Sequence, residues 1–456
     1  MQHTRRQFLK HAGVTALLPA LSQCSTNGIS QKPNIIFIMI DDLGYGDIGC
    51  YGSTVNKTPN IDSLARSGMI FRDYHSNGPM CSPTRASLMT GMYQHRLGEM
   101  FEGALSGTNE YDKGLPLETY TLADALKESG YATGIYGKWH LGFQPPFLPV
   151  NHGFDEFIGL GSGDGDHHTH IDRSGRNDWW HNNQLEMEAG YSTDLITGHS
   201  IDFIKAHSRQ PFFLYFSHVS IHFPWQGPND PPHRVEGIDY ADDKWGIIPD
   251  KNNVSPHVKA MVESIDLGVG RIMQTLQDLD LKENTLVIFT SDNGGYRHYG
   301  KSHFNISSNG PLRGQKSQVY EGGHRVPCIA SWPGTIPAGD VSDETIMTMD
   351  MFPTFVDLAR ADIPTNLYLD GISLVPHLLH NAAVPERAVC WKIDNIRAIR
   401  KGNWKLCLIG NTDPELYNLS NDIGETNNCA ADNPELVQQL MKEYSAWEQD
   451  VTVNYQ

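Results

Sequence analysis

Apolar residues cluster in short runs that alternate with stretches of helical periodicity through most of the chain. The clearest runs are Asn34 to Ile40, Tyr131 to Tyr136, Pro211 to Phe216 and Thr285 to Thr290. Because these runs are short and contain many β-branched or aromatic residues, each is predicted to form a strand. Strands that alternate with helices predict an α/β fold with a large, mostly parallel sheet flanked by helices.

Helix boundaries can be read from capping residues. Thr121 precedes an amphipathic segment from Leu122 to Ser129, and Gly130 follows it, which is the pattern of an N-cap and a C-terminal stop. Further helices are predicted from Pro59 to Ser67 and from His257 to Leu279.

The pattern changes after about residue 364. The last segments with clear periodicity are Ala388 to Ile393, Ala398 to Arg400, Lys405 to Ile409 and Pro434 to Glu448. They predict a small antiparallel sheet covered by one helix. A chain of 456 residues exceeds the usual size of one domain. We therefore predict a large domain over residues 33–363 and a C-terminal subdomain over 364–456.

The N-terminus is predicted to be an export signal over residues 1–24. Arg5 and Arg6 precede a short apolar run from Ala12 to Leu21, an arrangement that resembles a bacterial twin-arginine signal, although a basic pair can also arise by chance. Cys24 also stands where a lipoprotein would be acylated, but Gln23 departs from the usual small residue. The expected location is the periplasm or, with a lipid anchor, the cell envelope.

Composition narrows the possible partners. The net charge of -18 disfavours nucleic acids and anionic membrane surfaces, which bind concentrated basic faces. The N-terminal apolar run is too short to span a bilayer, so no transmembrane segment is predicted. An anionic small substrate remains compatible, because a few basic side chains and a metal ion can make one pocket positive.

Polar residues of the types that bind ligands or act in catalysis follow all four predicted strands. In chain order the pairs are Asp41 and Asp42, Lys138 and His140, His218 and His222, and Asp292 and Asn293. Any one pair could be only a turn or a helix cap. Because ligands bind at the carboxyl ends of strands in an open parallel sheet, four such pairs together predict one shared site.

The acidic pairs indicate a hard divalent cation. Asp41, Asp42, Asp292 and Asn293 offer only oxygen ligands, which suit Ca²⁺ or Mg²⁺ better than zinc or copper. Three carboxylates brought together would repel one another. Either a metal ion lies among them or some are protonated.

Cys81 is the candidate nucleophile. Pro83 fits the first turn of a helix, which would place Cys81 at the positive N-terminal end of that helix. Arg85, one turn later, could reach the same place. The alternative is a buried structural cysteine ahead of a helix.

Several short sequence blocks, in their order along the chain, resemble the type I sulfatases of the alkaline phosphatase superfamily. Cys81-Ser82-Pro83-Thr84-Arg85, followed by Ala-Ser-Leu-Met-Thr-Gly, resembles the family signature. Further blocks that resemble the family are Asp41 to Gly46, Gly137 to Gly142, Ser291 to Gly295, Tyr320 to Gly323, Arg400 to Lys405 and Glu415 to Leu419.

The resemblance implies a mechanism. A dedicated maturation enzyme would oxidise Cys81 to formylglycine, whose hydrated aldehyde attacks sulfur with one hydroxyl and expels sulfate with the other. One Ca²⁺ would be held by Asp41, Asp42, the oxidised Cys81, Asp292 and Asn293.

Other site residues follow from the same resemblance. Arg85 and His140 would orient the formylglycine, while Lys138, Lys316, His218 and His222 would contact the substrate. Lys316 could instead belong only to a basic loop. His222 is preferred to His218 as the acid for the leaving alcohol, because Phe223-Pro224 follows it.

The predicted substrate is a sulfated carbohydrate, with carrageenan-type galactans ahead of glycosaminoglycans. The long segment from Gly161 to Gln184 contains Arg173, Arg176 and Trp179, residue types that pair with sulfate or stack on sugars. It could also be a packed surface loop. Two other functions remain open: a phosphonate or phosphate monoester hydrolase, and a non-catalytic glycan-binding lipoprotein.

Overall fold

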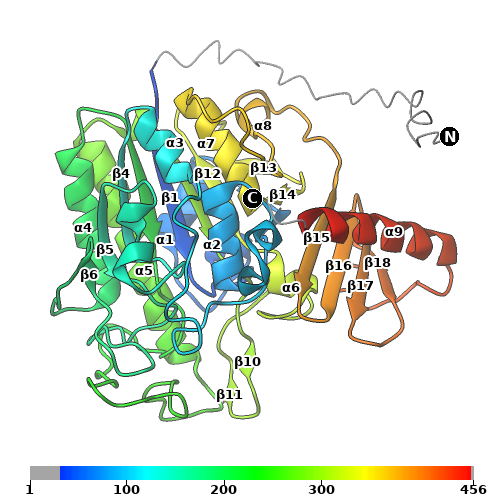
Figure 1. The fold of residues 1–456 in the computed structure, drawn as a ribbon, viewed down its shortest axis with the longest axis horizontal. Coiled ribbons are helices and arrows are strands. Elements are labelled where there is room, and N and C mark those ends of the chain that lie inside the picture. Colours follow the sequence, from blue (N-terminus) through cyan, green and yellow to red (C-terminus); the bar gives the residue numbers. More distant parts are fainter. Residues whose placement is uncertain (1–30, 453–456) are drawn as a thin grey trace, which may run out of the picture. The chain divides into compact units, whose positions relative to one another are not determined.

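A ten-stranded mixed sheet forms the centre of the structure, a computed structural model that describes residues 31–452. The predicted export signal and lipoprotein cysteine lie outside the described residues. The strand order is β13-β2-β12-β9-β1-β8-β4-β5-β6-β7 (Figure 1). Their bounds are β1 Asn34–Ile40, β2 Met69–Phe71, β4 Ala132–Lys138, β5 Glu156–Leu160, β6 Trp180–His181, β7 Gln184–Leu185, β8 Phe212–Ser217, β9 Thr285–Ser291, β12 Cys328–Ser331 and β13 Asp340–Ser342.

The parallel part of the sheet is its middle. Strands β9, β1, β8, β4 and β5 run parallel to one another. On either side of them β12 pairs antiparallel with β9, β6 pairs antiparallel with β5, and β7 pairs antiparallel with β6. All four strands predicted from the sequence belong to this parallel middle. All seven residues of β1 are buried, as expected for a strand covered on both faces.

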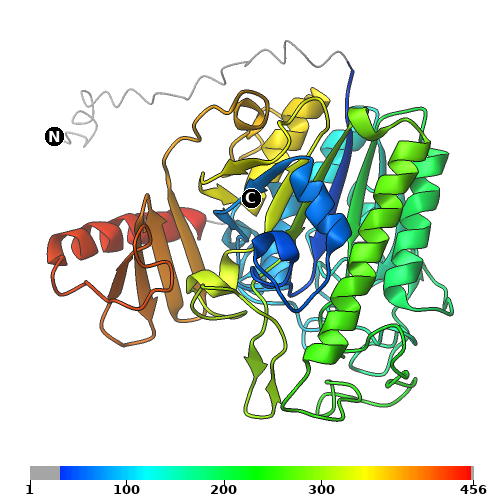
Figure 2. The same cartoon turned by 180° about the vertical axis from the view of Figure 1, so that it is seen from behind.

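Helices cover both faces of the large sheet. Figure 2 shows α1 (Pro59–Arg66), α4 (Ser192–Ala206) and α5 (Ser255–Asp278) on one face. On the other face, visible in Figure 1, lie α2 (Cys81–Thr90), α3 (Leu122–Glu128) and α7 (Met351–Ala359). The predicted cap is present at α3, where Thr121 Oγ1 accepts from the Asp124 N–H and Asp124 Oδ2 accepts from the Thr121 N–H.

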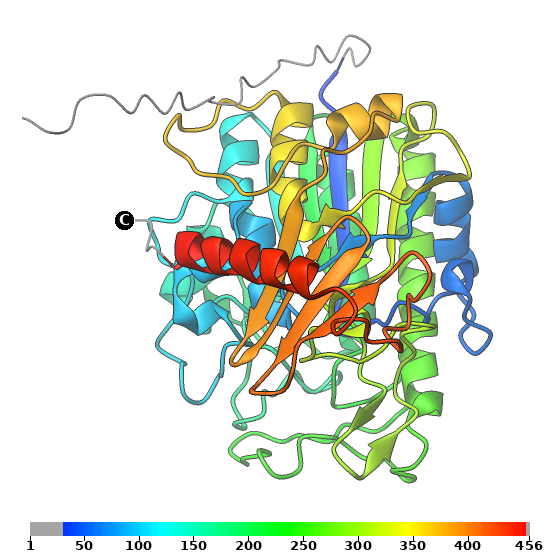
Figure 3. The same ribbon diagram turned by 90° about the vertical axis from the view of Figure 1, so that its right-hand side faces the viewer.

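A second, smaller sheet follows in the chain. Strands β15 (Ala388–Ile393), β16 (Ile396–Lys401), β17 (Trp404–Ile409) and β18 (Glu415–Asn418) form an antiparallel sheet in that order. Helix α9 (Pro434–Val451) lies across one face of it (Figure 3). The predicted sheet with one covering helix is therefore confirmed.

Shorter elements connect these layers: β3 (Tyr74–His75) with β14 (Ile346–Met347), the β10 (His298–Tyr299) and β11 (His303–Phe304) hairpin, α6 (Glu321–His324) and α8 (Val375–His380). Within residues 31–452, no helix is long and apolar enough to cross a membrane. The six cysteines in this range are free thiols.

Candidate active site

The sheet order brings together the polar residues that follow its central strands. Because β9, β1, β8 and β4 are neighbours in the sheet and run parallel, their carboxyl ends lie side by side at one edge of the sheet. There the backbone N–H of Asp42 donates to Asp292 Oδ1 at 3.3 Å. The Lys138 ammonium group lies 2.5 Å from Asp41 Oδ2. Three of the four predicted pairs thus meet directly at the edge of the sheet.

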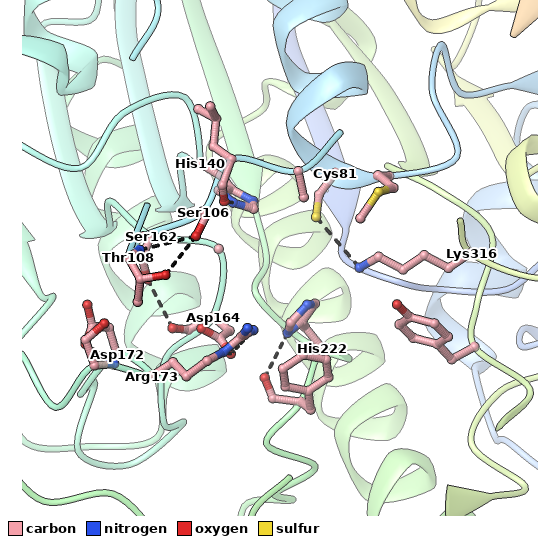
Figure 4. A pocket seen from close by; sticks show the side chains of 18 of the residues that line it. Cys81, Ser106, Thr108, His140, Ser162, Asp164, Asp172, Arg173, His222 and Lys316 are labelled. Atoms are coloured by element: carbon pink, nitrogen blue, oxygen red, sulfur yellow. Dashed lines mark hydrogen bonds and ion pairs between the residues drawn. The ribbon is translucent and has the colours of Figure 1, made fainter. Parts of the chain in front are cut away.

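Cys81 is the first residue of α2, and its side chain is 1% exposed. Pro83 lies in the first turn, as predicted from its missing N–H. The Cys81 Sγ lies 3.7 Å from Lys316 Nζ (Figure 4). Burial raises the pKa of the Cys81 thiol, although Lys138 and Lys316 oppose that shift.

Arg85 ties α2 to the end of the sheet. Its Nε and Nη2 donate to Asp292 Oδ2 at 3.0 and 2.8 Å. Its Nη1 donates to Ser217 Oγ at 2.7 Å and to the Lys138 carbonyl at 2.9 Å. One guanidinium group therefore fixes the helix that carries Cys81 against β9, β8 and β4.

The buried carboxylates are balanced by cationic side chains. Arg85 pairs with Asp292, Lys138 with Asp41, and Lys316 Nζ lies 2.5 Å from Asp42 Oδ1. From the sequence, a metal ion or protonation is expected to relieve the repulsion between these carboxylates. The structure adds a third means, because protein cations take one oxygen of each carboxylate.

Two buried oxygens at this place nevertheless have no partner. Neither Asp41 Oδ1 nor Asn293 Oδ1 makes a hydrogen bond within the described chain, although both are shielded from solvent. Burial and the neighbouring Asp292 raise the pKa of Asp41 well above its usual range. Ligand atoms of Asp41, Cys81 and Asp292 lie within 4.8 Å of one another. Unpaired hard oxygens in such a group fit a divalent cation.

A cavity of about 270 Å³ opens above Cys81. The catalytic candidates among its lining residues are Cys81, His140, His222 and Lys316 (Figure 4). Polar lining comes from the segments 104–108 and 162–174, and aromatic lining comes from Phe223, Tyr296 and Tyr299. The cavity therefore combines anion-binding groups at one end with hydrogen-bonding and aromatic surface beyond them.

The two cavity histidines have defined orientations. His140 Nε2 lies 2.9 Å from the Leu105 carbonyl and donates to it. His222 Nδ1 donates to the Phe223 carbonyl at 2.8 Å, and its Nε2 lies 3.9 Å from Asp42 Oδ2. Since a carbonyl can only accept, these contacts leave the other nitrogen of each ring available. Burial, with the ammonium groups of Lys316 and Lys138, lowers the pKa of His222 well below its usual value.

Two predicted substrate contacts are corrected by the structure. His218 is fully buried, lies outside the cavity lining and has no hydrogen bond from either ring nitrogen within the described residues. Trp179 is also fully buried; its ring stacks on His170 and its Nε1 donates to Glu188. Neither side chain can contact a sugar, because strand and loop packing encloses both.

The two loop arginines differ in position. Arg173 lines the cavity, and its Nε and Nη2 donate to Asp164 Oδ2 at 3.1 and 2.8 Å. Arg176 lies outside the lining and binds Asp172 and the Gly107 carbonyl. A direct sugar contact by Arg176 stays a prediction.

Some cavity residues were not identified from the sequence. Asp164, Phe223, Tyr296 and Tyr299 all line it. The tyrosines follow Asn293 within six positions, so closeness to a predicted metal ligand was an available signal. Asp164 carried none, because it contributes through a loop whose path depends on tertiary packing.

Comparison with known families agrees with this geometry. Residues 33–361 match the Sulfatase family model, and residues 314–450 match the model of the N-sulphoglucosamine sulphohydrolase C-terminal region. The chain belongs to the sulfatase family. Sulfate ester hydrolysis is therefore the reaction class that the cavity must serve.

Curated sulfatases resemble most of the chain. The N-acetylgalactosamine-6-sulfatase of Canis lupus familiaris is 34% identical over 396 residues, covering 83% of this chain and 72% of its own length. Arylsulfatase A of Homo sapiens is 33% identical over 472 residues, covering 90% of this chain and 87% of its own length.

Solved structures show the same architecture. Ps i-CgsB has a TM-score of 0.81 and 31% identity, covering 93% of this chain and 95% of its own. A second structure of that protein, in complex with k-i-k-neocarrahexaose, has a TM-score of 0.80 and 30% identity over the same shares. A phosphonate monoester hydrolase of Agrobacterium radiobacter, at 19% identity and a TM-score of 0.62, shares the fold.

Proposed function

We propose that this sulfatase removes sulfate from a sulfated carbohydrate, with Cys81 converted to formylglycine as the source of the nucleophile. The observation that carries the proposal is the position of Cys81. It lies at the start of α2 and at the cavity, 3.7 Å from the Lys316 ammonium group. A helix N-terminus and a lysine both favour an anionic sulfate at that position.

The two groups that the family resemblance implies would supply the central chemistry. A hydrated formylglycine provides a hydroxyl nucleophile and a second hydroxyl that later expels sulfate. One Ca²⁺ would be held by Asp41, Asp42, Asp292, Asn293 and the oxygen at position 81, where it would neutralise charge on the sulfate. The unpaired oxygens of Asp41 and Asn293 support that ligand set.

The remaining side chains would bind and orient. Lys316, which lines the cavity, would attract sulfate oxygens directly. Lys138 is fully buried beside Asp41 and outside the lining, so it would act on the sulfate through its positive charge. Arg85 would hold α2 against Asp292. His140 would steady the nucleophile from the cavity. His222 would direct Nε2 toward the oxygen of the leaving alcohol, since its Nδ1 donates to a carbonyl. To protonate that oxygen the ring must take up a second proton at Nε2, which the negative charge of a bound sulfate would favour.

Of the possible substrate classes, we propose a carrageenan-type galactan first and glycosaminoglycans second. The likeness to a protein solved with k-i-k-neocarrahexaose supports this order. Arg173 in the cavity supports a carbohydrate larger than the sulfate group alone. Export by the N-terminal signal, maturation by a formylglycine-generating enzyme and location in the periplasm or on a lipid anchor complete the proposal.

Mass spectrometry of the peptide containing Cys81, from fully active enzyme, tests the nucleophile. We expect a mass that corresponds to formylglycine at position 81 and loss of turnover by at least about 10⁴-fold in Cys81→Ala. An intact thiol in fully active enzyme contradicts the mechanism. Desulfation of carrageenan and glycosaminoglycan oligosaccharides, resolved by linkage position, tests the substrate order.

Turnover of nitrophenyl esters and the state of Cys81 separate this function from the two alternatives. A phosphonate or phosphate monoester hydrolase would turn over nitrophenyl phosphate faster than nitrophenyl sulfate, because the two esters have similar shapes but different charges. A non-catalytic glycan-binding lipoprotein would carry unmodified Cys81 in its native host and hydrolyse neither ester.

A further inference from the structure

An aromatic strip runs along the cavity between its two cationic ends. We define the strip as Phe223, Tyr296 and Tyr299. At one end the Lys316 ammonium group lies 5.3 Å from the Tyr296 ring centroid. At the other end the Arg173 guanidinium lies 5.2 Å from the Phe223 ring centroid.

The strip is continuous and supported from behind. The Tyr296 and Tyr299 ring centroids lie 5.0 Å apart, and those of Tyr299 and Phe223 lie 5.9 Å apart. Trp245 packs against Tyr299 at 4.1 Å and against Phe223 at 5.1 Å. Packed rings lose little conformational freedom when a ligand lies on them, so the strip is ready to receive an apolar face.

The Arg173 end also presents a hydrogen-bond acceptor. Asp164 Oδ2 receives donors from Arg173 and from the buried Arg234, at 2.8 and 3.3 Å for the two Nη2 atoms. Both arginines bind the same oxygen, Oδ2, and Asp164 lines the cavity, so its carboxylate is the acceptor offered at this end. Figure 4 shows Asp164 and Arg173 together on one side of His222, with Lys316 on the other.

This pairing selects among ligand groups. A second sulfate at this end would meet the Asp164 carboxylate and be repelled by it. A hydroxyl group can donate to the Asp164 carboxylate and accept from Arg173 at once. A sugar ring satisfies all the surfaces together, because its C–H face is apolar while its edge carries hydroxyls.

We propose that the aromatic strip and the Asp164 and Arg173 pair bind the pyranose ring that carries the scissile sulfate, with a ring hydroxyl between Asp164 and Arg173. The sulfate lies at the Lys316 end, and the ring packs along the tyrosines. This inference rests on the proposed carbohydrate sulfatase function and specifies its binding site. It replaces buried Trp179 as the predicted stacking residue.

The test compares sugar sulfates with a sulfate that lacks hydroxyls. The probes are methyl galactoside 4-sulfate, methyl galactoside 6-sulfate and cyclohexyl sulfate, each assayed for kcat/KM. The wild-type enzyme is expected to prefer one galactoside sulfate over cyclohexyl sulfate by at least about 100-fold, because a site built for a hydroxyl rejects a ligand without one.

Variants then separate binding from folding. Asp164→Asn and Tyr299→Ala should each reduce that preference by at least about tenfold, through loss of the acceptor or of the stacking face. Tyr299→Ala is included because Asp164→Asn could destabilise the neighbourhood of Arg234. Arg271→Lys, at an exposed position of α5, is the matched control and should leave the preference unchanged.

Three outcomes overturn the inference. The first is a wild-type enzyme that turns over cyclohexyl sulfate as well as both galactosides. The second is a Tyr299→Ala variant that folds and keeps the full preference. The third is a preference for a galactoside disulfate that Arg173→Lys abolishes, which would assign this end to a second sulfate. Hydrolysis of cyclohexyl sulfate in the first case leaves sulfatase activity itself intact, whereas loss of all hydrolysis in correctly matured enzyme contradicts the proposed function.

Discussion

The structure buries two clusters of paired charges that contain the same kinds of groups. They differ in whether every buried oxygen has a hydrogen-bond or ion-pair partner. The site cluster, at the edge of the large sheet, consists of Asp41, Asp42, Asp292, Arg85, Lys138 and Lys316. The inter-sheet cluster, beside the small sheet, consists of Asp73, Glu321, Glu425, Arg325, Arg400 and Lys405. Each has three carboxylates and three cationic side chains.

Every carboxylate oxygen of the inter-sheet cluster has a partner. Lys405 lies 2.8 Å from Glu321 Oε1 and 2.9 Å from Glu425 Oε1, and Glu425 Oε2 accepts from the Glu321 N–H at 2.7 Å. Arg400 grips both oxygens of Asp73 at 2.6 and 2.7 Å. Buried charges of this kind hold the two sheets together, because each ion is fully compensated.

The inter-sheet cluster also shows why a donor set alone does not make a metal site. Ligand atoms of His75, Glu321 and His324 lie within 4.8 Å of one another. The Lys405 ammonium group, however, lies 2.8 Å from Glu321 and 3.1 Å from His324 Nε2. The site cluster differs in keeping Asp41 Oδ1 unpaired, with Asn293 Oδ1 beside the cluster also unpaired. An unpaired buried oxygen, rather than charge, distinguishes the candidate functional centre.

The largest expected effect comes from breaking the site cluster with Asp292→Asn. We expect kcat/KM to fall by at least about 1,000-fold and bound Ca²⁺ to be lost, because the negative charge of one ligand and its ion pair with Arg85 are removed together. Elemental analysis and sulfate release measure the two effects. Asp266→Asn, at an equally buried carboxylate that receives N–H donors from α1, is the matched control and should keep both metal and activity. A variant at Asp292 with one Ca²⁺ per chain and normal turnover would falsify the ligand assignment.

A second prediction breaks the inter-sheet cluster with Lys405→Met. The substitution leaves Glu321 and Glu425 buried without their shared cation, so the free energy of unfolding should fall by about 3 to 5 kcal/mol. Urea unfolding measures it. At a temperature where the variant is folded, its Ca²⁺ content should match the wild type.

Lys401→Met provides the control for that experiment. Lys401 pairs with Glu443 at 3.0 Å, but the two side chains are 38% and 28% exposed. An ion pair in contact with solvent contributes little, so its loss should cost less than about 1 kcal/mol. Equal losses in the two variants would show that the inter-sheet cluster gains nothing from burial.

The smallest expected effect on activity concerns His218, which lies beside the site without belonging to it. Burial lowers the pKa of His218 to about 3. Its folded pKa is therefore below the unfolded value, and its stabilising contribution is present above about pH 6.5 and is lost as the pH falls toward 3. His218→Phe should keep kcat within about threefold, because neither ring nitrogen has a partner to lose.

The stability of that variant should also respond less to acid. Between pH 7 and pH 4 the wild type should lose about 3 kcal/mol more of its free energy of unfolding than His218→Phe does. Thermal or urea unfolding at the two pH values gives the difference. Identical pH profiles, or a large loss of turnover, would instead assign His218 a charged or catalytic role.

The sequence by itself determined the strand and helix segments and most of the site. Continuous apolar runs such as Asn34–Ile40 are compatible only with burial on both faces, so the central sheet followed from local patterns. The position of Cys81 at a helix start followed from Pro83, because proline is favoured in a first turn. The polar blocks and their order along the chain carry the resemblance to the sulfatase family without any knowledge of contacts.

Only the tertiary structure decided which polar residues face the cavity and which are paired. His218 and His222 lie four positions apart, yet packing buries the first and directs the second to the cavity. Trp179 was a plausible sugar contact by residue type, but the fold encloses it, and Tyr296 and Tyr299 line the cavity in its place. The direction in which a side chain points depends on neighbours that come from distant segments of the chain. The local sequence around a residue does not specify those neighbours.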